Sequence, residues 1–207
     1  DIHVMASGGS GEDGGIGGSG TVSVGGPINI ITGNSPIEDN TDWAEILAVG
    51  GDGNNDGDGG YASFTAKSSV GIATGSGRSR VFVGGEGGDD DGDSDGGHAA
   101  MDIRGNLVIK GGNNRDQAQG GEGNTVGVFG IGGRGTSGFT GGNGSLSVAG
   151  GIGVTLGGPD TNSVFVQAQG GDGDGGPGGD GLVEVGTDVS IKAAGHSAMV
   201  LVGGEGG

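Results

Sequence analysis

The chain has 207 residues, of which 61 are glycine and none is cysteine, and its formal net charge is −18. This acidity opposes binding to nucleic acid and to anionic membranes, and the lack of cysteine excludes a disulfide framework. No run is long and apolar enough to span a bilayer, so we expect no membrane insertion. Asp1 is not an initiator and no signal peptide follows it, which predicts a processed protein or a piece of one.

Glycine recurs at every third position in several blocks, the first of which contains Gly8, Gly11, Gly14, Gly17 and Gly20. A period of three fits neither an α-helix nor a β-strand, but it matches an extended helix of the polyproline II type. Such a helix has no internal hydrogen bonds, so its backbone groups need partners on neighbouring segments. We therefore predict a stacked layer of polyglycine-II helices.

Short alternating runs of Val, Ile, Leu and Ala lie between the glycine blocks and predict β-strands. In one of them we expect Val81 and Val83 to face inward and Phe82 outward. The order strand, glycine stretch, strand, turn, strand returns about five times, in repeats 1–43, 44–79, 80–124, 125–162 and 163–198, with a partial repeat at 199–207. The sequence therefore predicts one all-β domain over residues 1–207, a parallel β-solenoid with a polyglycine layer.

One segment, residues 33–44, breaks the repeat and contains Pro36, Asp42 and Trp43. Asp42 is a candidate cap for a short helix that begins near Trp43. The alternative is an inserted loop whose aromatic side chain covers an exposed edge of the core. A third interpretation makes Trp43 a platform for a sugar.

The densest acidic cluster is a candidate calcium site, because carboxylate oxygens that alternate with small residues are able to converge on this hard cation. It lies within residues 84–97 and consists of Asp89, Asp90, Asp91, Asp93 and Asp95. Calcium is the one cofactor that the sequence suggests. The alternative is a solvated acidic rim that keeps the array soluble.

Catalytic chemistry has one candidate pair, Asp102 and Arg104, which are two residues apart and are expected on the outer face of a strand. Parallel β-helices that act on polysaccharides use Asp and Arg side chains. No groove-forming insertion accompanies this pair, so we expect an exposed pair of side chains and no enzyme. The three histidines are too far apart in the sequence for a metal site.

Residues 105–112, 144–151 and 186–195 resemble the strand-turn units of filamentous-haemagglutinin-type surface proteins. That resemblance implies a parallel β-helix exported by bacteria and used in adhesion. The glycine blocks look more like the glycine-helix bundles of springtail antifreeze proteins and of some phage tail-tip adhesins. Both resemblances imply an extracellular role, and neither transfers a site residue.

Together these patterns predict a secreted or cell-surface structural protein that forms a fibre, a filament or an adhesin stalk. Because neither end has a polar cap, we expect self-association or continuation into a longer chain. A surface glycan is a further candidate partner. The alternatives are an ice-binding protein, which the absence of a Thr-x-Thr ladder disfavours, and a carbohydrate-active enzyme.

Overall fold

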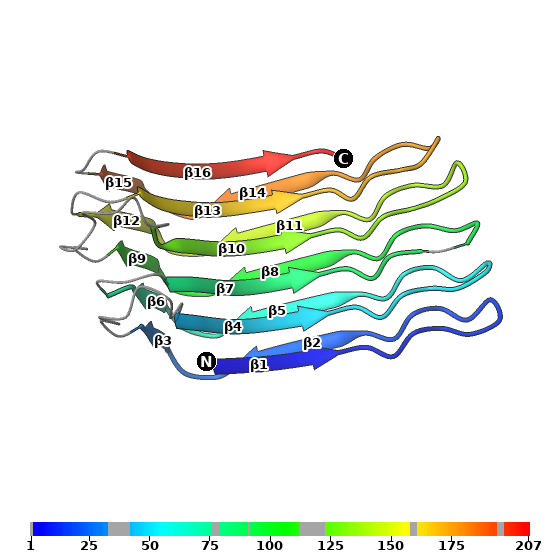
Figure 1. Ribbon diagram of the computed structural model, residues 1–207, viewed down its shortest axis with the longest axis horizontal. Coiled ribbons are helices and arrows are strands. Elements are labelled where there is room, and N and C mark those ends of the chain that lie inside the picture. The colour runs from blue at the N-terminus through cyan, green and yellow to red at the C-terminus, as the bar shows by residue number, and fades with distance from the viewer. Residues whose placement is uncertain are drawn as a thin grey trace.

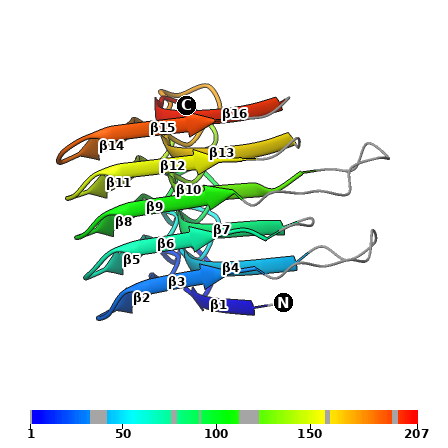
Figure 2. The ribbon, with the colours of Figure 1, turned by 90° about the vertical axis from the view of Figure 1, so that its left-hand side faces the viewer.

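The computed structural model describes residues 2–32, 42–75, 79–90, 92–111, 123–157, 161–193 and 197–207. These residues form sixteen β-strands and no helix, so none of them belongs to a helix able to cross a membrane. The strands make three parallel sheets that wind as a β-solenoid of about five turns (Figures 1 and 2). This architecture confirms the predicted fold class.

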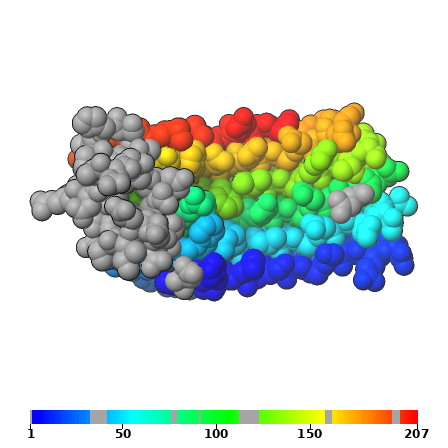
Figure 3. All heavy atoms as spheres, viewed as in Figure 1, coloured from blue at the N-terminus to red at the C-terminus, as the bar shows by residue number. Residues whose placement is uncertain are grey.

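Each turn contributes one strand to each sheet. Sheet A has the order β1 (Ile2–Ser7), β4 (Asp42–Val49), β7 (Ser79–Glu86), β10 (Thr125–Ile131), β13 (Thr161–Gln169) and β16 (Ser197–Glu205). Sheet B contains β2 (Gly20–Val24), β5 (Ala62–Ala66), β8 (Ala99–Ile103), β11 (Gly144–Val148) and β14 (Gly181–Val185). Sheet C contains β3 (Ile28–Ile31), β6 (Val70–Ala73), β9 (Leu107–Gly111), β12 (Ile152–Leu156) and β15 (Val189–Ala193). In the space-filling view the turns follow one another as bands in chain order (Figure 3).

The strands stack without a shift in register, so equivalent side chains form columns along the solenoid axis. One inward column of sheet A consists of Val4, Ile46, Val83, Val128, Val166 and Val202. Val81 and Val83 have no exposed surface, whereas Phe82 between them is partly exposed, which confirms the predicted faces. The core is therefore a stack of Val, Ile, Leu and Ala, widened by Phe64 and Met101 from sheet B.

Between sheet A and sheet B, each turn extends a glycine-rich arm away from the sheets (Figure 1). The first arm reverses direction at Asp13 and Gly14, whose φ angles are 50° and 82°. The amide of Gly15 closes this turn by donating to the carbonyl of Glu12 at 3.0 Å. Positive φ at both central positions is typical of a tight hairpin turn, and it favours Gly, Asn and Asp.

A continuous zigzag of backbone hydrogen bonds connects the arms. The amide of Gly18 donates to the carbonyl of Gly9 at 2.6 Å, and that of Gly51 donates to the carbonyl of Gly18 at 2.8 Å. Each arm has an outgoing limb, which leads away from sheet A, and a returning limb, which leads back to sheet B. The hydrogen bonds alternate between the two kinds of limb and continue through Gly60, Gly88, Gly97, Gly133, Gly142, Gly171, Gly179 and Gly207. Each limb therefore supplies the partners that its neighbour lacks.

These glycines are also packed too closely for any side chain. A Cβ at Gly88 would overlap the carbonyl oxygen of Gly51, and one at Gly133 would overlap that of Gly88. The α-hydrogens in those places therefore point at carbonyl oxygens, a geometry that adds weak Cα–H···O contacts to the N–H···O bonds. The spacing of glycine in the sequence reflects this close approach of backbones.

The helix predicted near Trp43 is wrong, because β4 begins at Asp42 and includes Trp43. Residues 42–49 pair with β7 throughout, and residues 44–49 pair with β1 on the other side. Pairing on both edges outweighs the local capping preference of Asp42. Pro36 and the loop predicted around it lie outside the described residues.

Candidate functional site

The aspartates of the arms stand in columns and accept backbone hydrogen bonds from the following turn. Asp52 Oδ1 accepts the amide of Asp89 at 3.1 Å, and Asp89 Oδ1 accepts the amide of Arg134 at 2.8 Å. On the returning limb, Asp58 and Asp95 accept the amides of Asp95 and Thr140 at 3.4 and 2.8 Å. These carboxylates are exposed, and they satisfy amides that point out of the glycine layer.

The same rule applies in two further columns. His98 Nδ1 accepts the amide of Asn143 at 2.7 Å, and Asn143 Oδ1 accepts the amide of Asp180 at 2.8 Å. At the corner between sheets B and C, Ser69 and Asn106 accept the amides of Asn106 and Gly151 at 3.1 and 2.9 Å. We call these four columns the acceptor ladders. In all eight bonds the side chain belongs to one turn and the amide to the next.

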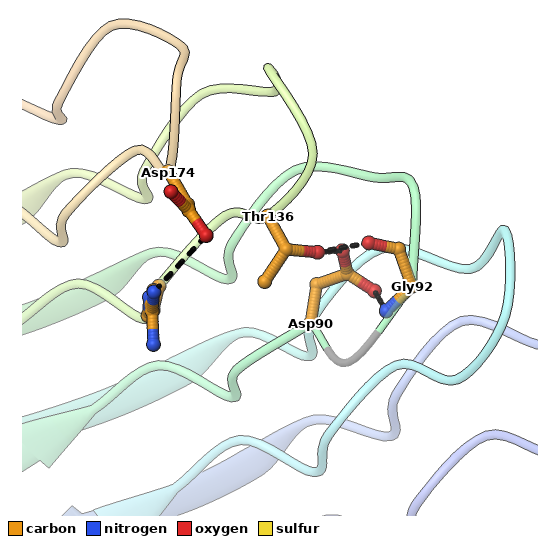
Figure 4. Close-up of polar contacts among 5 residues, drawn as sticks. Asp90, Gly92, Thr136 and Asp174 are labelled. Carbon is orange, nitrogen blue, oxygen red and sulfur yellow. Dashed lines mark hydrogen bonds and ion pairs between the residues drawn. The ribbon is translucent and has the colours of Figure 1, made fainter.

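Asp90 departs from the ladders because its carboxylate turns inward and is 1% exposed (Figure 4). Asp90 Oδ1 accepts the amide of Gly92 at 2.7 Å, while Oδ2 accepts the amide of Ser94 at 2.9 Å and the hydroxyl of Thr136 at 2.8 Å. The Thr136 hydroxyl also contacts the carbonyl of Gly92. Three donors thus stabilise a buried carboxylate and hold the tip of the third arm against the fourth.

The predicted calcium ligands are distributed over different environments. Asp89 and Asp95 stand in separate ladders, Asp90 is turned inward, and Asp93 is exposed. Asp91 lies outside the described residues. Among the residues that the structure describes, no three His, Asp or Glu side chains come together as a metal site. Calcium binding by this segment stays a prediction.

Stacking of acidic residues has an electrostatic consequence at the base of the arms. Burial raises the pKa of the Glu86 carboxyl above its ordinary value, and the negative charges of Asp89, Asp52 and Glu45 raise it further. Glu86 is the last residue of β7, where sheet A leads into the third arm. This carboxylate is therefore repelled in the folded state by the ladders that begin beside it.

Aromatic side chains pack together on the outer face of sheet A. The ring centroids of Trp43 and Phe82 are 5.6 Å apart, and those of Phe82 and Phe129 are 6.3 Å apart. The Arg80 guanidinium lies 5.8 Å from the Trp43 ring centroid. The Phe82 ring also covers Gly127 on the adjacent strand. Trp43 thus belongs to a packed cluster, and its role toward a sugar is untested.

Asp102 and Arg104 lie close together, but only Asp102 is in a strand, because β8 ends at Ile103 and Arg104 follows it. Arg104 Nε donates to Asp102 Oδ2 at 3.2 Å, and the two side chains are 60% and 40% exposed respectively. An ion pair this exposed contributes little to stability, typically about 0–1 kcal/mol. Nothing in this pair tests for or against catalysis.

The sequence interpretation missed a set of hydroxyl side chains on the outer face of sheet B, which we call the hydroxyl face. It consists of Thr21 and Ser23 on β2, Ser63 and Thr65 on β5, and Ser145 and Ser147 on β11. Ala100 and Asp102 on β8 interrupt the two rows, and Leu182 and Glu184 end them on β14. A search for Thr alone overlooks these rows, since serine occupies most of the positions.

Comparison with protein-family models, with curated proteins and with solved structures found no significant match to the chain. The interpretation of its function therefore depends on the geometry described above.

Proposed function

We propose that the chain is an extracellular structural protein, secreted or held at a cell surface, which serves as part of a fibre, filament or adhesin stalk. Its arms act as a polyglycine-II layer that stiffens the β-solenoid. The observation that supports this proposal best is the zigzag of ten backbone hydrogen bonds from Gly9 to Gly207. It runs along the solenoid axis and makes every turn depend on its neighbours.

The energetics favour a structural role. Ordering glycine costs more backbone entropy than ordering any other residue, so a single arm is not expected to hold its shape alone. Stacking offsets that cost, because each added turn extends three sheets, the zigzag and the acceptor ladders together. Such an array gains stability with length and resists bending, as a stalk requires.

The two ends of the array support assembly into something longer. Val189 and Ile191 on β15 are each 46% exposed, whereas their counterparts Ile152 and Val154, one turn below, are each 1% exposed. At the opposite end Val4 is 48% exposed. Apolar columns that end in solvent favour one more turn as a partner, from a second copy or from a continuation of the chain.

The proposal is tested by measuring the mass and shape of the purified chain over a range of concentrations. We expect light scattering to show a mass that grows with concentration. Negative-stain electron microscopy should show particles that lengthen along one axis. Compact, strictly monomeric particles at high concentration would contradict self-assembly.

The hydroxyl face supports a second candidate function, ice binding. Its side chains repeat about every 4.8 Å across strands and about every 6.6 Å along them, an ordered array able to bind ordered water. Ser63, Thr65, Thr21 and Ser23 form the longest uninterrupted part of this array. Thermal hysteresis of a dilute solution tests this function, and Thr65→Glu should abolish any hysteresis found. Its absence in the unmodified chain would exclude ice binding.

A further inference from the structure

The outer faces of the three sheets differ in charge. The outward columns of sheet A include Glu45, and those of sheet B include Asp102 and Glu184. In the described strands of sheet C, the outward columns contain no acidic residue, and they carry Lys110 and Lys192. Because the chain has a net charge of −18, this is the sheet face where another acidic surface meets the least repulsion.

The lysines of sheet C are accessible to a partner. They belong to one outward column, which consists of Ile31, Ala73, Lys110, Thr155 and Lys192. Lys110, Thr155 and Lys192 are all exposed. A Cβ at Gly153, in the neighbouring outward column, would meet nothing within 4 Å, so this part of the face is open. A partner is therefore able to reach both ammonium groups.

The tips of the arms lie on the opposite side of the molecule from sheet C. Figure 1 draws the arms at its right-hand side, and Figure 2, which looks from the left-hand side, has sheet C in front. Exposed carboxylates stand near the tips of the first, second, third and fifth arms, at Asp13, Asp56, Asp93 and Asp174. The fourth arm, residues 132–143, has no acidic residue and carries Arg134. The tips thus form a mainly acidic edge.

The charges on these two sides follow the same order along the solenoid axis. On sheet C, lysine occupies the third and fifth turns, on β9 and β15, with Thr155 between them on β12. On the arms, the third and fifth tips are acidic and the fourth is not. Both sides share one rise of about 4.8 Å per turn. Two copies side by side, parallel and level, would bring Asp93 to Lys110 and Asp174 to Lys192.

We propose that sheet C is an interface for a second copy of the chain, which binds it with the tips of its arms. Each copy offers one surface of each kind, so the contact is heterologous and open-ended, and it joins solenoids into a flat bundle. This inference rests on the proposed structural role and adds a sideways contact to it. Asp174 also contacts Arg134 at 3.3 Å, but that pair is exposed and weak, so its carboxylate is able to accept a lysine as well.

Reversing the charges tests this contact. Lys110→Glu/Lys192→Glu, the face variant, and Asp93→Lys/Asp174→Lys, the tip variant, each place like charges opposite one another. We expect each alone to need about tenfold higher concentration than the unmodified chain to associate in light scattering. An equimolar mixture restores opposite charges at every contact and should associate like the unmodified chain. That rescue would also show that both variants fold.

A matched control separates the contact from the net charge. Arg80→Glu/Arg104→Glu changes the net charge as much as the face variant does, but outside the outward columns of sheet C. We expect it to associate like the unmodified chain. A face variant that associates as strongly as this control, or a mixture that fails to associate, would overturn the sideways contact while the proposed self-assembly stands. If the unmodified chain itself stays monomeric, both fail.

Carbodiimide cross-linking of the unmodified chain tests the alignment, since this reagent joins an amine to a contacting carboxylate as an amide. We expect mass spectrometry to find Lys110 joined to Asp93 and Lys192 joined to Asp174. Such links form between copies, because the two partners lie on opposite sides of one molecule (Figures 1 and 2). A link between Lys192 and Asp13 instead would show that neighbouring solenoids are antiparallel, and would overturn the proposal.

Discussion

Gly133 and Gly97, which belong to adjacent turns, are joined by a backbone hydrogen bond of 2.7 Å in the middle of the zigzag. The Cα of Gly133 also approaches the carbonyl of Gly88 so closely that a Cβ would overlap its oxygen. The backbone of residues 87–88 therefore excludes a side chain at this position, while the hydrogen bond to Gly97 holds Gly133 in place. The zigzag is a packing constraint as well as a hydrogen-bond network.

Gly133→Ala should destabilise the chain by about 3 kcal/mol, because neither backbone is free to move away without breaking the zigzag. Gly153→Ala is the matched control, since Gly153 lies in a strand and a Cβ there meets nothing within 4 Å. We expect the control to melt at or slightly above the temperature of the unmodified chain. Equal effects of the two substitutions, measured by thermal or urea unfolding, would contradict the close packing of the arms.

The sheets were predictable from the sequence because their signal is local. Short runs rich in Val, Ile, Leu and Ala, such as residues 81–83, predict a strand from a few consecutive residues, and a run of this kind returns in each repeat. The role of the aspartates was not predictable in this way. Asp52 accepts from an amide 37 residues away and Asp89 from one 45 residues away, so the offset changes with the length of each turn.

Trp43 and Thr21 show two other limits of structure prediction from the sequence. A capping residue before Trp43 suggested a helix, but pairing with β1 and β7 determines the conformation there. Thr21 belongs to a row that continues with Ser63 on the adjacent strand, and only the strand register reveals that row. In both cases the decisive neighbour comes from another turn.

Asp90→Ala should destabilise the chain by about 2–4 kcal/mol, because it leaves the amides of Gly92 and Ser94 and the Thr136 hydroxyl without their charged acceptor. Asp93→Ala removes a charge from an exposed position of the same segment. We expect its effect to stay within about 0.5 kcal/mol. Urea denaturation of both variants measures the difference, and an Asp90 variant as stable as the Asp93 variant would contradict the buried role of Asp90.

Glu86 gives a prediction about pH. Its pKa is raised in the folded state, so the folded chain binds more protons there than the unfolded chain near and somewhat above the ordinary pKa of glutamate. The contribution of Glu86 to stability should therefore improve as the pH falls from neutral through the raised pKa. At pH 7, Glu86→Gln should raise the melting temperature by about 1–2 °C, because it removes a repelled charge.

The difference between Glu86→Gln and the unmodified chain isolates this effect from the titration of the other acids. We expect that difference to shrink at lower pH and at high salt, which screens the charges of Asp89 and Asp52. A variant that is less stable than the unmodified chain at pH 7 would show that Glu86 makes a favourable contact which outweighs the repulsion.

The calcium prediction for residues 89–95 is decided by comparing divalent cations. Calcium that binds only the folded chain stabilises it by about 2.7 kcal/mol at a concentration 100 times its Kd, so the melting temperature should rise and a chelator should reverse the rise. Screening of the acceptor ladders alone would give magnesium the same effect as calcium. A calcium-specific rise that Asp95→Asn reduces would establish a site in this segment. A melting temperature that changes equally with both cations, or with neither, would contradict a specific calcium site. Asp89 and Asp95 would then serve only as acceptors for the amides of Arg134 and Thr140.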